Sequence, residues 1–199
     1  FNVKKVSFNE ILKLSDGLIF FSKKGAITRY NHNKKIIWKN NYYSKAEKKL
    51  KPKLNFLINN DTLIVVDNIA KYYSININTG KLNWSKNSNY PFNSEIKKYK
   101  NKFFVVDYKN ILRCFNINDG SECWKMKTEE SFTISDSKFS QIIINDLVIF
   151  NNSIGDVTAV DIETGLINWQ LPTQSSNIIN KTYKFKNSQL VSDGNSIFF

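Results

Sequence analysis

The spacing of the tryptophans is the sequence feature that most constrains the fold. Trp38, Trp84, Trp124 and Trp169 lie 46, 40 and 45 residues apart in a chain of 199 residues. A repeat of this length is typical of propeller blades and also of arrays of paired helices. The residues around each tryptophan decide between the two architectures, because the period alone fits both.

Three of the tryptophans end the same short pattern. It is SININTGKLNW at residues 74–84, CFNINDGSECW at residues 114–124 and AVDIETGLINW at residues 159–169. In each segment a small residue leads, Asn or Asp follows two positions later, and Gly comes four positions before Trp. The glycine allows the positive φ that a tight hairpin requires, and the flanking β-branched and aromatic residues favour strands. We therefore predict three β-hairpins and exclude helix pairs.

A further pair of strands is predicted ahead of each hairpin. Apolar runs occur at residues 18–21, 63–66, 103–106 and 147–150, each after a polar turn and another short strand. Four strands per repeat with one tryptophan each is the unit of a β-propeller. We predict an all-β chain of four-stranded antiparallel blades at about 8–38, 54–84, 94–124 and 139–169, with the start of a fifth at about 183–199. About four and a half blades would be a fragment of a propeller of about 7–8 blades.

The residues of the repeated motif are expected to be structural. An indole offers a flat apolar body for packing between sheets and an N–H donor, while Asn or Asp before a turn can accept from nearby backbone N–H groups. The alternative for the tryptophans is a ligand platform. The motif comprises Trp38, Trp84, Trp124, Trp169, Gly80, Gly120, Gly165, Asn76, Asn116 and Asp161.

The first repeat departs from this pattern. Its hairpin is one residue shorter, and Lys34 stands where the other repeats have glycine. Asparagine tolerates the left-handed backbone region better than most residues. We therefore predict that Asn33 takes the left-handed conformation in this turn.

The complete motif A-x-D-x-x-T-G-x-x-x-W at residues 159–169 resembles the tryptophan-docking motif of PQQ-like, or quinoprotein-type, propeller repeats. The resemblance covers nearly the whole chain. It implies that each tryptophan packs against the neighbouring blade. In the PQQ-dependent dehydrogenases that share this repeat, the cofactor lies on the propeller axis with a calcium ion, acidic and amide ligands, and two sequence-adjacent cysteines in a disulfide.

The two cysteines of this chain do not match that adjacent pair. Cys114 and Cys123 lie on the two arms of one predicted hairpin. If Asn118 and Asp119 form a two-residue turn, the cysteines face each other. With a four-residue turn they are diagonal neighbours and too far apart to bridge without movement. A disulfide and a pair of free thiols are therefore both open.

The sequence also lacks the residues that hydrolytic and zinc sites require. His32 is the single histidine and lies in a polar turn, and the sequence contains no HExxH, no G-x-S-x-G and no glycine-rich phosphate loop. Asp67 and Asp107 follow core strands at equivalent places, where the fourth repeat has Asn151. This repetition favours a turn role over paired catalytic carboxylates. We predict that the chain is not an enzyme and holds no cofactor or metal.

The positive charge of the chain does not indicate a nucleic-acid surface. The chain has 29 Lys+Arg against 17 Asp+Glu, a net charge of +12, but only Arg29 and Arg113 are arginines. Nucleic-acid surfaces cluster their charge and use arginine for bidentate contacts. The lysine excess accompanies many Asn and Ile residues, as an AT-rich coding sequence produces. The densest basic stretch, residues 45–53, is expected to be a solvated inter-blade loop or a short helical turn, with an anionic partner surface as the alternative.

Among PQQ-like propellers without cofactor residues, the chain is similar to the BamB family. These are lipoproteins of the outer-membrane β-barrel assembly machinery. The resemblance implies a non-catalytic protein-interaction scaffold in the periplasm of a Gram-negative bacterium, held at the outer membrane by an N-terminal lipid that this chain does not include. The implied partner is the central β-barrel assembly subunit.

The candidate partner-binding residues lie in the linker at residues 128–140. Family members place the partner surface on inter-blade loops near the middle of the chain, and Phe132 and Ile134 are the candidates at the comparable place here. The alternative is that both belong to the first strand of the fourth blade or its lead-in. A different function, a quinoprotein dehydrogenase or a ligand-sensing propeller, requires a site in blades outside this chain.

Overall fold

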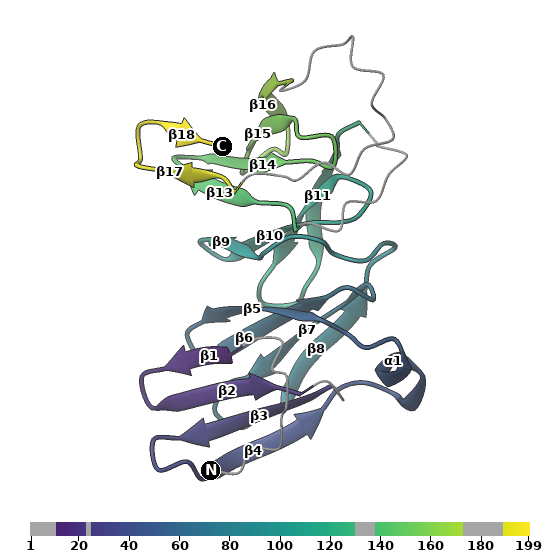
Figure 1. The fold of residues 1–199 in the computed structure, drawn as a ribbon, viewed down its shortest axis with the longest axis vertical. Helices are drawn as coiled ribbons and strands as arrows, with labels where there is room; N and C mark the ends of the chain where they lie inside the picture. The colour runs from purple at the N-terminus through teal and green to yellow at the C-terminus, as the bar shows by residue number, and fades with distance from the viewer. Residues whose placement is uncertain (1–10, 23–24, 130–137, 173–188) are drawn as a thin grey trace. The chain divides into compact units, whose positions relative to one another are not determined.

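Among the residues that the structure describes, the regular secondary structure is almost all β-strand, which confirms the predicted all-β class (Figure 1). The computed structural model describes residues 11–22, 25–129, 138–172 and 189–199. The chain divides into two compact units, Phe1–Asn89 and Tyr90–Phe199. Within each unit the strands follow one another in simple antiparallel meanders.

The first unit holds two four-stranded sheets. The strands of the first are β1 (Ile11–Leu14), β2 (Gly17–Phe21), β3 (Ala26–Asn31) and β4 (Ile36–Asn41), and those of the second are β5 (Leu54–Asn59), β6 (Thr62–Asp67), β7 (Lys71–Asn76) and β8 (Leu82–Asn87). In both sheets the spatial order equals the order in the sequence. Such a meander needs only short turns between strands, which agrees with the polar turn residues that separate the apolar runs.

The basic stretch between these sheets begins as a short helix, α1 (Lys45–Lys49). Ser44 caps it, since its Oγ accepts from the Glu47 N–H at 3.2 Å while Glu47 Oε2 accepts from the Ser44 N–H at 2.6 Å. This reciprocal pair is a capping box. No residue of the helix is buried. The lysines therefore lie on a solvated helical turn, one of the two forms expected.

The second unit repeats this plan. Its strands are β9 (Lys97–Tyr99), β10 (Lys102–Val106), β11 (Ile111–Asn116) and β12 (Glu122–Lys127), then β13 (Gln141–Ile144), β14 (Leu147–Asn151), β15 (Val157–Asp161) and β16 (Ile167–Leu171), and finally the hairpin β17 (Val191–Ser192) and β18 (Ile197–Phe198). The strand β17 lies beside β13 (Figure 1). Leu190 and Ile197 pack there with Ile142 and Ile144.

The strands β6 and β10 form much of the core, because both of their faces are covered. In β6 the four residues Leu63 to Val66 are fully buried, and residues 103–106 of β10 are buried in the same way. Burying a Val, Leu, Ile or Phe side chain contributes about 1.5–3 kcal/mol. These are the apolar runs that the sequence identified, so the sheets within each unit pack face to face through them.

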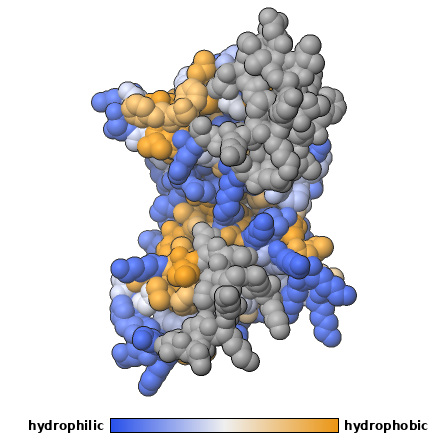
Figure 2. All heavy atoms as spheres, in the orientation of Figure 1, coloured by the Kyte–Doolittle hydropathy of each residue, from blue (hydrophilic) through white to orange (hydrophobic). Residues whose placement is uncertain are grey.

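Apolar side chains also remain on the surface, several of them on the fourth strands. The large exposed ones on these strands are Ile36 and Ile37 of β4, Leu82 of β8, and Ile167 and Leu171 of β16. In the space-filling view apolar side chains also gather over β17 and β18, at the upper left, while hydrophilic side chains cover much of the remaining described surface (Figure 2). Val191 and Phe198 are exposed in that hairpin.

All four hairpins between third and fourth strands carry the same bulge. Arg29, Ser74, Cys114 and Ala159 are each opposite the tryptophan of their repeat, and the register then shifts by one residue. The extra residue is the one before each tryptophan, namely Ile37, Asn83, Cys123 and Asn168. A bulge redirects a side chain locally. The sequence pattern predicted the hairpins but not this irregularity.

The first of these hairpins turns at Lys34. Its φ is +60°, while Asn33 does not have a positive φ, so the prediction for Asn33 is wrong. The Lys34 N–H donates to Asn31 O at 3.0 Å, and the Asn31 N–H donates to Lys35 O at 3.0 Å. Lys34 therefore directly precedes the residue whose carbonyl closes the hairpin. Gly80 has this position in the second repeat, where the Asn76 N–H donates to Lys81 O.

We expect Lys34→Gly to stabilise the chain by about 0.5–1 kcal/mol, because glycine adopts a positive φ without the steric cost that other residues carry. Urea denaturation followed by circular dichroism measures the change. Lys35→Gly is the matched control, since Lys35 has no positive φ, and it should be destabilising. Equal destabilisation by both changes would show that the turn conformation at Lys34 carries no strain.

Candidate functional site

The tryptophan of the first sheet lies against the turn of the second sheet. Trp38 is 8% exposed, and its Nε1–H donates to Ile77 O at 2.9 Å. A Cβ atom at Gly80 would lie 2.6 Å from Trp38 Cδ2. The Gly80 carbonyl in turn accepts from Asn40 Nδ2 at 2.8 Å and from the Tyr42 hydroxyl. The absence of a side chain at Gly80 therefore allows the indole to pack directly on backbone.

The second unit repeats this contact between its two complete sheets. Trp124 Nε1–H donates to Ile162 O at 2.9 Å, and a Cβ atom at Gly165 would lie 2.6 Å from Trp124 Cδ2. Gly80 and Gly165 have φ values of +67° and +74°. Glycine is thus required at each position for two reasons: the turn needs a positive φ, and the indole leaves no room for a Cβ atom.

The other two tryptophans are half-buried. Trp84 meets Tyr72 edge to face, with ring centroids 5.7 Å apart. Trp169 packs against the cluster formed by Ile149, Val157 and Ala159 with Leu190.

The Asn and Asp residues of the motif bind the backbone of their own turns. Asn76 Oδ1 accepts from the Asn78 and Thr79 N–H groups, and Asp161 Oδ1 accepts from those of Glu163 and Thr164. The Thr164 N–H and hydroxyl hold the pKa of Asp161 below its ordinary value. In the third repeat Asn116 Oδ1 accepts from the Asn118 N–H at 2.9 Å. Gly120 ends that turn with a φ of +66° and donates its N–H to Asn116 O. These side chains hold the hairpin turns in shape.

We expect Gly165→Ala to cost about 2–4 kcal/mol, the sum of a positive φ and a clash with the Trp124 ring. Gly194→Ala is the matched control. Its φ is +97°, but an added Cβ would have no atom within 4 Å, so it should cost about 1 kcal/mol. Urea denaturation followed by tryptophan fluorescence separates the two. Equal costs would mean that the indole contact contributes nothing beyond the turn.

A second polar position recurs in the turns between second and third strands. Ser22, Asp67, Asp107 and Asn152 each accept backbone N–H groups from their own turn with their side-chain oxygen. The equivalent in the fourth repeat is therefore Asn152, and the assignment to Asn151 is wrong. Asn151 Oδ1 instead accepts from the Ser140 N–H at 2.8 Å.

Asp67 is fully buried in a polar cluster beneath α1. The Tyr43 hydroxyl donates to Asp67 Oδ2 at 2.6 Å, and the Ile69 and Lys71 N–H groups donate to Oδ1 at 2.9 Å. Lys71 Nζ forms an ion pair with Glu47 Oε1 at 3.0 Å and lies 5.1 Å from the Tyr43 ring centroid. Burial raises the pKa of Asp67 and that of Tyr43 above their ordinary values. All these groups are engaged with one another.

The raised pKa of Asp67 gives a test. Because the folded state binds this proton more tightly than the unfolded state, Asp67 lowers the free energy of unfolding as pH rises from its ordinary pKa of 3.8 through the raised value. Asp67→Asn removes the ionisable carboxyl and supplies an amide oxygen as the turn acceptor, as Asn152 does in the fourth repeat. The variant should therefore gain stability relative to the parent chain as pH rises through that window, measured by urea denaturation across pH. A pH-independent difference would contradict the raised pKa.

Both arginines of the chain are buried and paired, so neither is offered to a polyanion. Arg113 Nε donates to Asp107 Oδ2 at 2.9 Å, and its NH1 donates to Glu122 Oε2 at 2.6 Å. Burial raises the pKa of Asp107, while Arg113 acts in the opposite direction. Arg29 NH2 donates to Asp16 Oδ2 at 2.5 Å.

Arg29 is the residue that sequence reasoning missed. It occupies the place opposite the tryptophan where the other repeats have Ser, Cys and Ala. Its NH1 donates to Ile77 O and to Asn78 Oδ1, both at 2.9 Å, so Ile77 O accepts from Arg29 as well as from Trp38. An alignment of the first repeat on Trp38 with one bulge residue would have placed Arg29 at this position.

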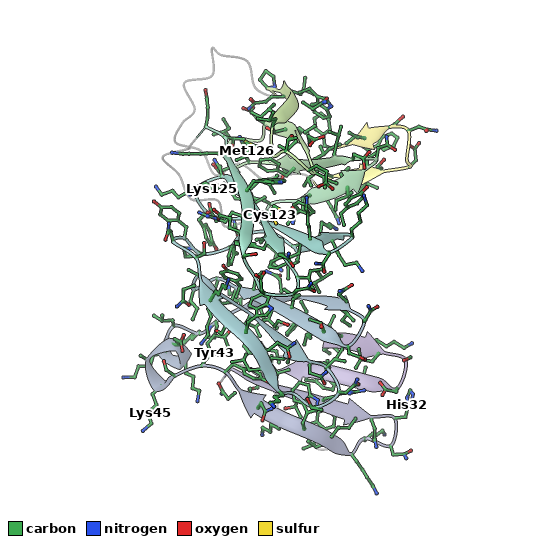
Figure 3. All side chains as sticks on the ribbon, turned by 180° about the vertical axis from the view of Figure 1, so that it is seen from behind. His32, Tyr43, Lys45, Cys123, Lys125 and Met126 are labelled. Carbon is green, nitrogen blue, oxygen red and sulfur yellow. The ribbon has the colours of Figure 1, made fainter. Side chains whose placement is uncertain are left out.

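A pocket of about 350 Å³ adjoins Arg29 in the first unit. Its charged lining consists of Lys13, Asp16, Arg29 and Asp61. His32 lies at the β3–β4 end of this unit, with Nε2 2.7 Å from Ser15 O (Figure 3). The pocket offers charged and hydrogen-bonding groups without pairing a nucleophile with a base.

The two cysteines are free thiols on neighbouring strands. Cys114 is buried in β11, whereas Cys123 is exposed on β12 (Figure 3). The turn between the strands leaves four residues, 117–120, between the closing Asn116 and Ser121, so the four-residue alternative is the one found. The register places Cys114 opposite Trp124, with Cys123 as the extra residue of the bulge beside that pair.

The candidate partner residues Phe132 and Ile134 lie outside the described residues. Among the residues that are described, no three His, Cys, Asp or Glu side chains are grouped so that they could bind a metal ion. In the described ranges, no helix is long and apolar enough to cross a membrane, since α1 has five residues.

Four-stranded antiparallel sheets with a tryptophan on each fourth strand define a partial β-propeller of PQQ-like repeats. The profile of one such family, described as "Outer membrane protein assembly factor BamB", matches residues 23–199. The chain belongs to this family. No curated protein matches it.

Solved structures support the fold. BamB from Moraxella catarrhalis superposes with a TM-score of 0.67 at 19% identity, over 81% of this chain and 47% of that one. The chain thus spans about half the length of that relative. The computationally designed Ika4 protein superposes with a TM-score of 0.63 at 9% identity, over 81% of this chain and 95% of its own. The designed Ika8 protein gives 0.56 at 9% identity, over 96% of this chain and 66% of its own.

Proposed function

We propose that this chain is part of a non-catalytic interaction scaffold that works with the outer-membrane β-barrel assembly machinery. The observation that carries the proposal is the family match, which extends over residues 23–199. The scaffold would act at the periplasmic face of the outer membrane through an N-terminal lipid anchor, with the central β-barrel subunit as its partner. Its four tryptophans would dock neighbouring blades.

The use of the buried charges supports a structural rather than a catalytic role. Asp67 and Asp107 bind turn backbone, and Arg113 is enclosed by Asp107 and Glu122. A catalytic carboxylate or cation needs a free face toward a substrate. The hydrogen bonds of these groups are made within the blades that they stabilise.

Two other functions place the chemistry outside this chain. A PQQ-dependent dehydrogenase requires an adjacent cysteine pair and axial polar ligands, and this sequence has no adjacent cysteines. A ligand-sensing propeller requires a fused signalling domain. Both remain alternatives because the chain spans about half of its structural relative.

A pull-down with the full-length gene product tests the proposal. We expect a β-barrel assembly subunit to co-elute from outer-membrane extract, identified by mass spectrometry, and the purified protein to lack quinone absorbance. Co-purified quinone, or calcium-dependent dye reduction with alcohols or sugars, would support the dehydrogenase instead. Failure to capture any barrel subunit would overturn the scaffold proposal.

Two double variants test which surface of the chain binds the partner. Phe132→Asp combined with Ile134→Asp should abolish co-elution without lowering the thermal midpoint, if the linker binds the partner. The matched control is Lys48→Ala with Lys49→Ala in the exposed helix α1. Loss of co-elution in the control variant alone would move the partner surface to the basic stretch.

A further inference from the structure

The bulge shared by the four hairpins lies between two positions whose side chains are in direct contact in the second repeat. One is the residue opposite the tryptophan, and the other is the residue just before it. In the second repeat these are Ser74 and Asn83, and Asn83 Nδ2 donates to Ser74 Oγ at 3.0 Å. The same register in the third repeat places Cys114 beside Cys123.

We propose that Cys114 and Cys123 form a dithiol pair that closes to a disulfide across the β11–β12 hairpin. Two observations carry this. The two cysteines have the positions at which Ser74 and Asn83 are in direct contact in the second repeat, and both thiols are free. The two cysteines of the chain therefore meet at a place that the fold has already built in another repeat.

The environment of the pair sets the order of reaction. Cys114 is fully buried and burial raises the pKa of its thiol, whereas Cys123 is exposed. The charge of Lys102, whose Nζ is paired with Glu163, acts against burial and lowers the pKa of Cys114. The exposed thiol is the one that an external disulfide reaches first.

The reaction is two thiol–disulfide exchanges with an external disulfide. The Cys123 thiolate attacks one sulfur of that disulfide, which forms a mixed disulfide and releases one thiolate. Cys114 then loses its proton and attacks Cys123 Sγ, which displaces the second thiolate and leaves the Cys114–Cys123 bond. Two protein thiols are oxidised, the external disulfide is reduced to two thiols, and the two protons pass to the leaving groups.

The bond would fix the strand that carries an indole contact. Trp124 follows Cys123 directly and donates its Nε1–H to Ile162 O in the next sheet of the unit. Cross-linking Cys114 to Cys123 restricts the unfolded chain and holds this hairpin in register. Oxidised chain should therefore melt at a higher temperature than reduced chain.

Intact-mass measurement tests the pair directly. The wild-type chain is incubated with oxidised glutathione, unfolded and treated with N-ethylmaleimide. We expect a monomer that has lost two hydrogens and carries no maleimide, whereas the chain reduced beforehand carries two. A monomer that still takes up two maleimides, or a disulfide-linked dimer, would overturn the proposal.

Single variants test the order of attack while the chain stays folded. Cys114→Ser should accumulate one glutathione on Cys123, whereas Cys123→Ser should leave Cys114 unmodified until the chain is unfolded. Glutathione on Cys114 of folded Cys123→Ser, with none on Cys123 of Cys114→Ser, would reverse the assignment.

A transplanted pair tests the geometry without removing either native cysteine. Ser74→Cys combined with Asn83→Cys should form a second disulfide under the same conditions. The matched control combines Ser74→Cys with Asn87→Cys, since Asn87 is opposite Lys71 and not Ser74. Equal cross-linking in the two variants would show that proximity in the bulge does not select the pair.

Discussion

The contact between an indole and the backbone of the next turn is the interaction on which each unit depends. A single acceptor, Ile77 O or Ile162 O, receives the indole N–H of the preceding sheet, and a glycine beside it lets the ring reach the chain. An indole N–H that is removed from water costs free energy unless it finds an acceptor. Sheets that pack through Val, Ile and Phe alone could slide, because hydrophobic contact has no direction. The hydrogen bond fixes one relative position, so the apolar faces of neighbouring sheets meet in one register.

Polar side chains play the complementary role inside the sheets. Asp67, Asp107 and Asn152 accept the N–H groups of tight turns that would otherwise be buried without partners, and Asn76 and Asp161 do the same in the hairpins. The buried carboxylates are tolerated because they are enclosed by donors, as at Tyr43 and Lys71 around Asp67. Burial still raises their pKa values. The repeated carboxyl or amide is thus a consequence of turn geometry, and its recurrence in the sequence carries no signal of catalysis.

The architecture was predictable because its signals are local and repeated. Strands can be recognised from the tryptophan spacing, from the apolar runs and from the Thr-Gly or Asp-Gly turns between them, without knowledge of tertiary contacts. The structure has strands at the tryptophans and at the apolar runs.

The errors in the prediction concern features that the residue types alone do not encode. Lys34 rather than Asn33 takes the positive φ because the position beside the closing residue of the hairpin, and not residue preference, decides which residue turns. Arg29 was overlooked because a long cation at a position filled elsewhere by Ser, Cys or Ala breaks the sequence pattern, although its guanidinium reaches Asp16 and Asn78. The bulge escaped detection because it shifts pairing without changing composition.

That bulge makes one pair of positions chemically adjustable while the blade remains constant. The residue opposite the tryptophan and the residue before it are Arg29 with Ile37, Ser74 with Asn83, Cys114 with Cys123, and Ala159 with Asn168. Side chains of four different kinds are therefore found at the same backbone positions. This is possible because the indole contact and the turn determine the register independently of these two residues. In the first repeat the position opposite the tryptophan holds a buried cation, Arg29, because Asp16 and the next turn supply acceptors. In the second repeat the two positions are joined by a neutral hydrogen bond. Two cysteines stand at the same positions in the third repeat, where other residues already fix the register. A redox function at this hairpin thus requires no new architecture, only two substitutions at positions that the fold already brings into contact.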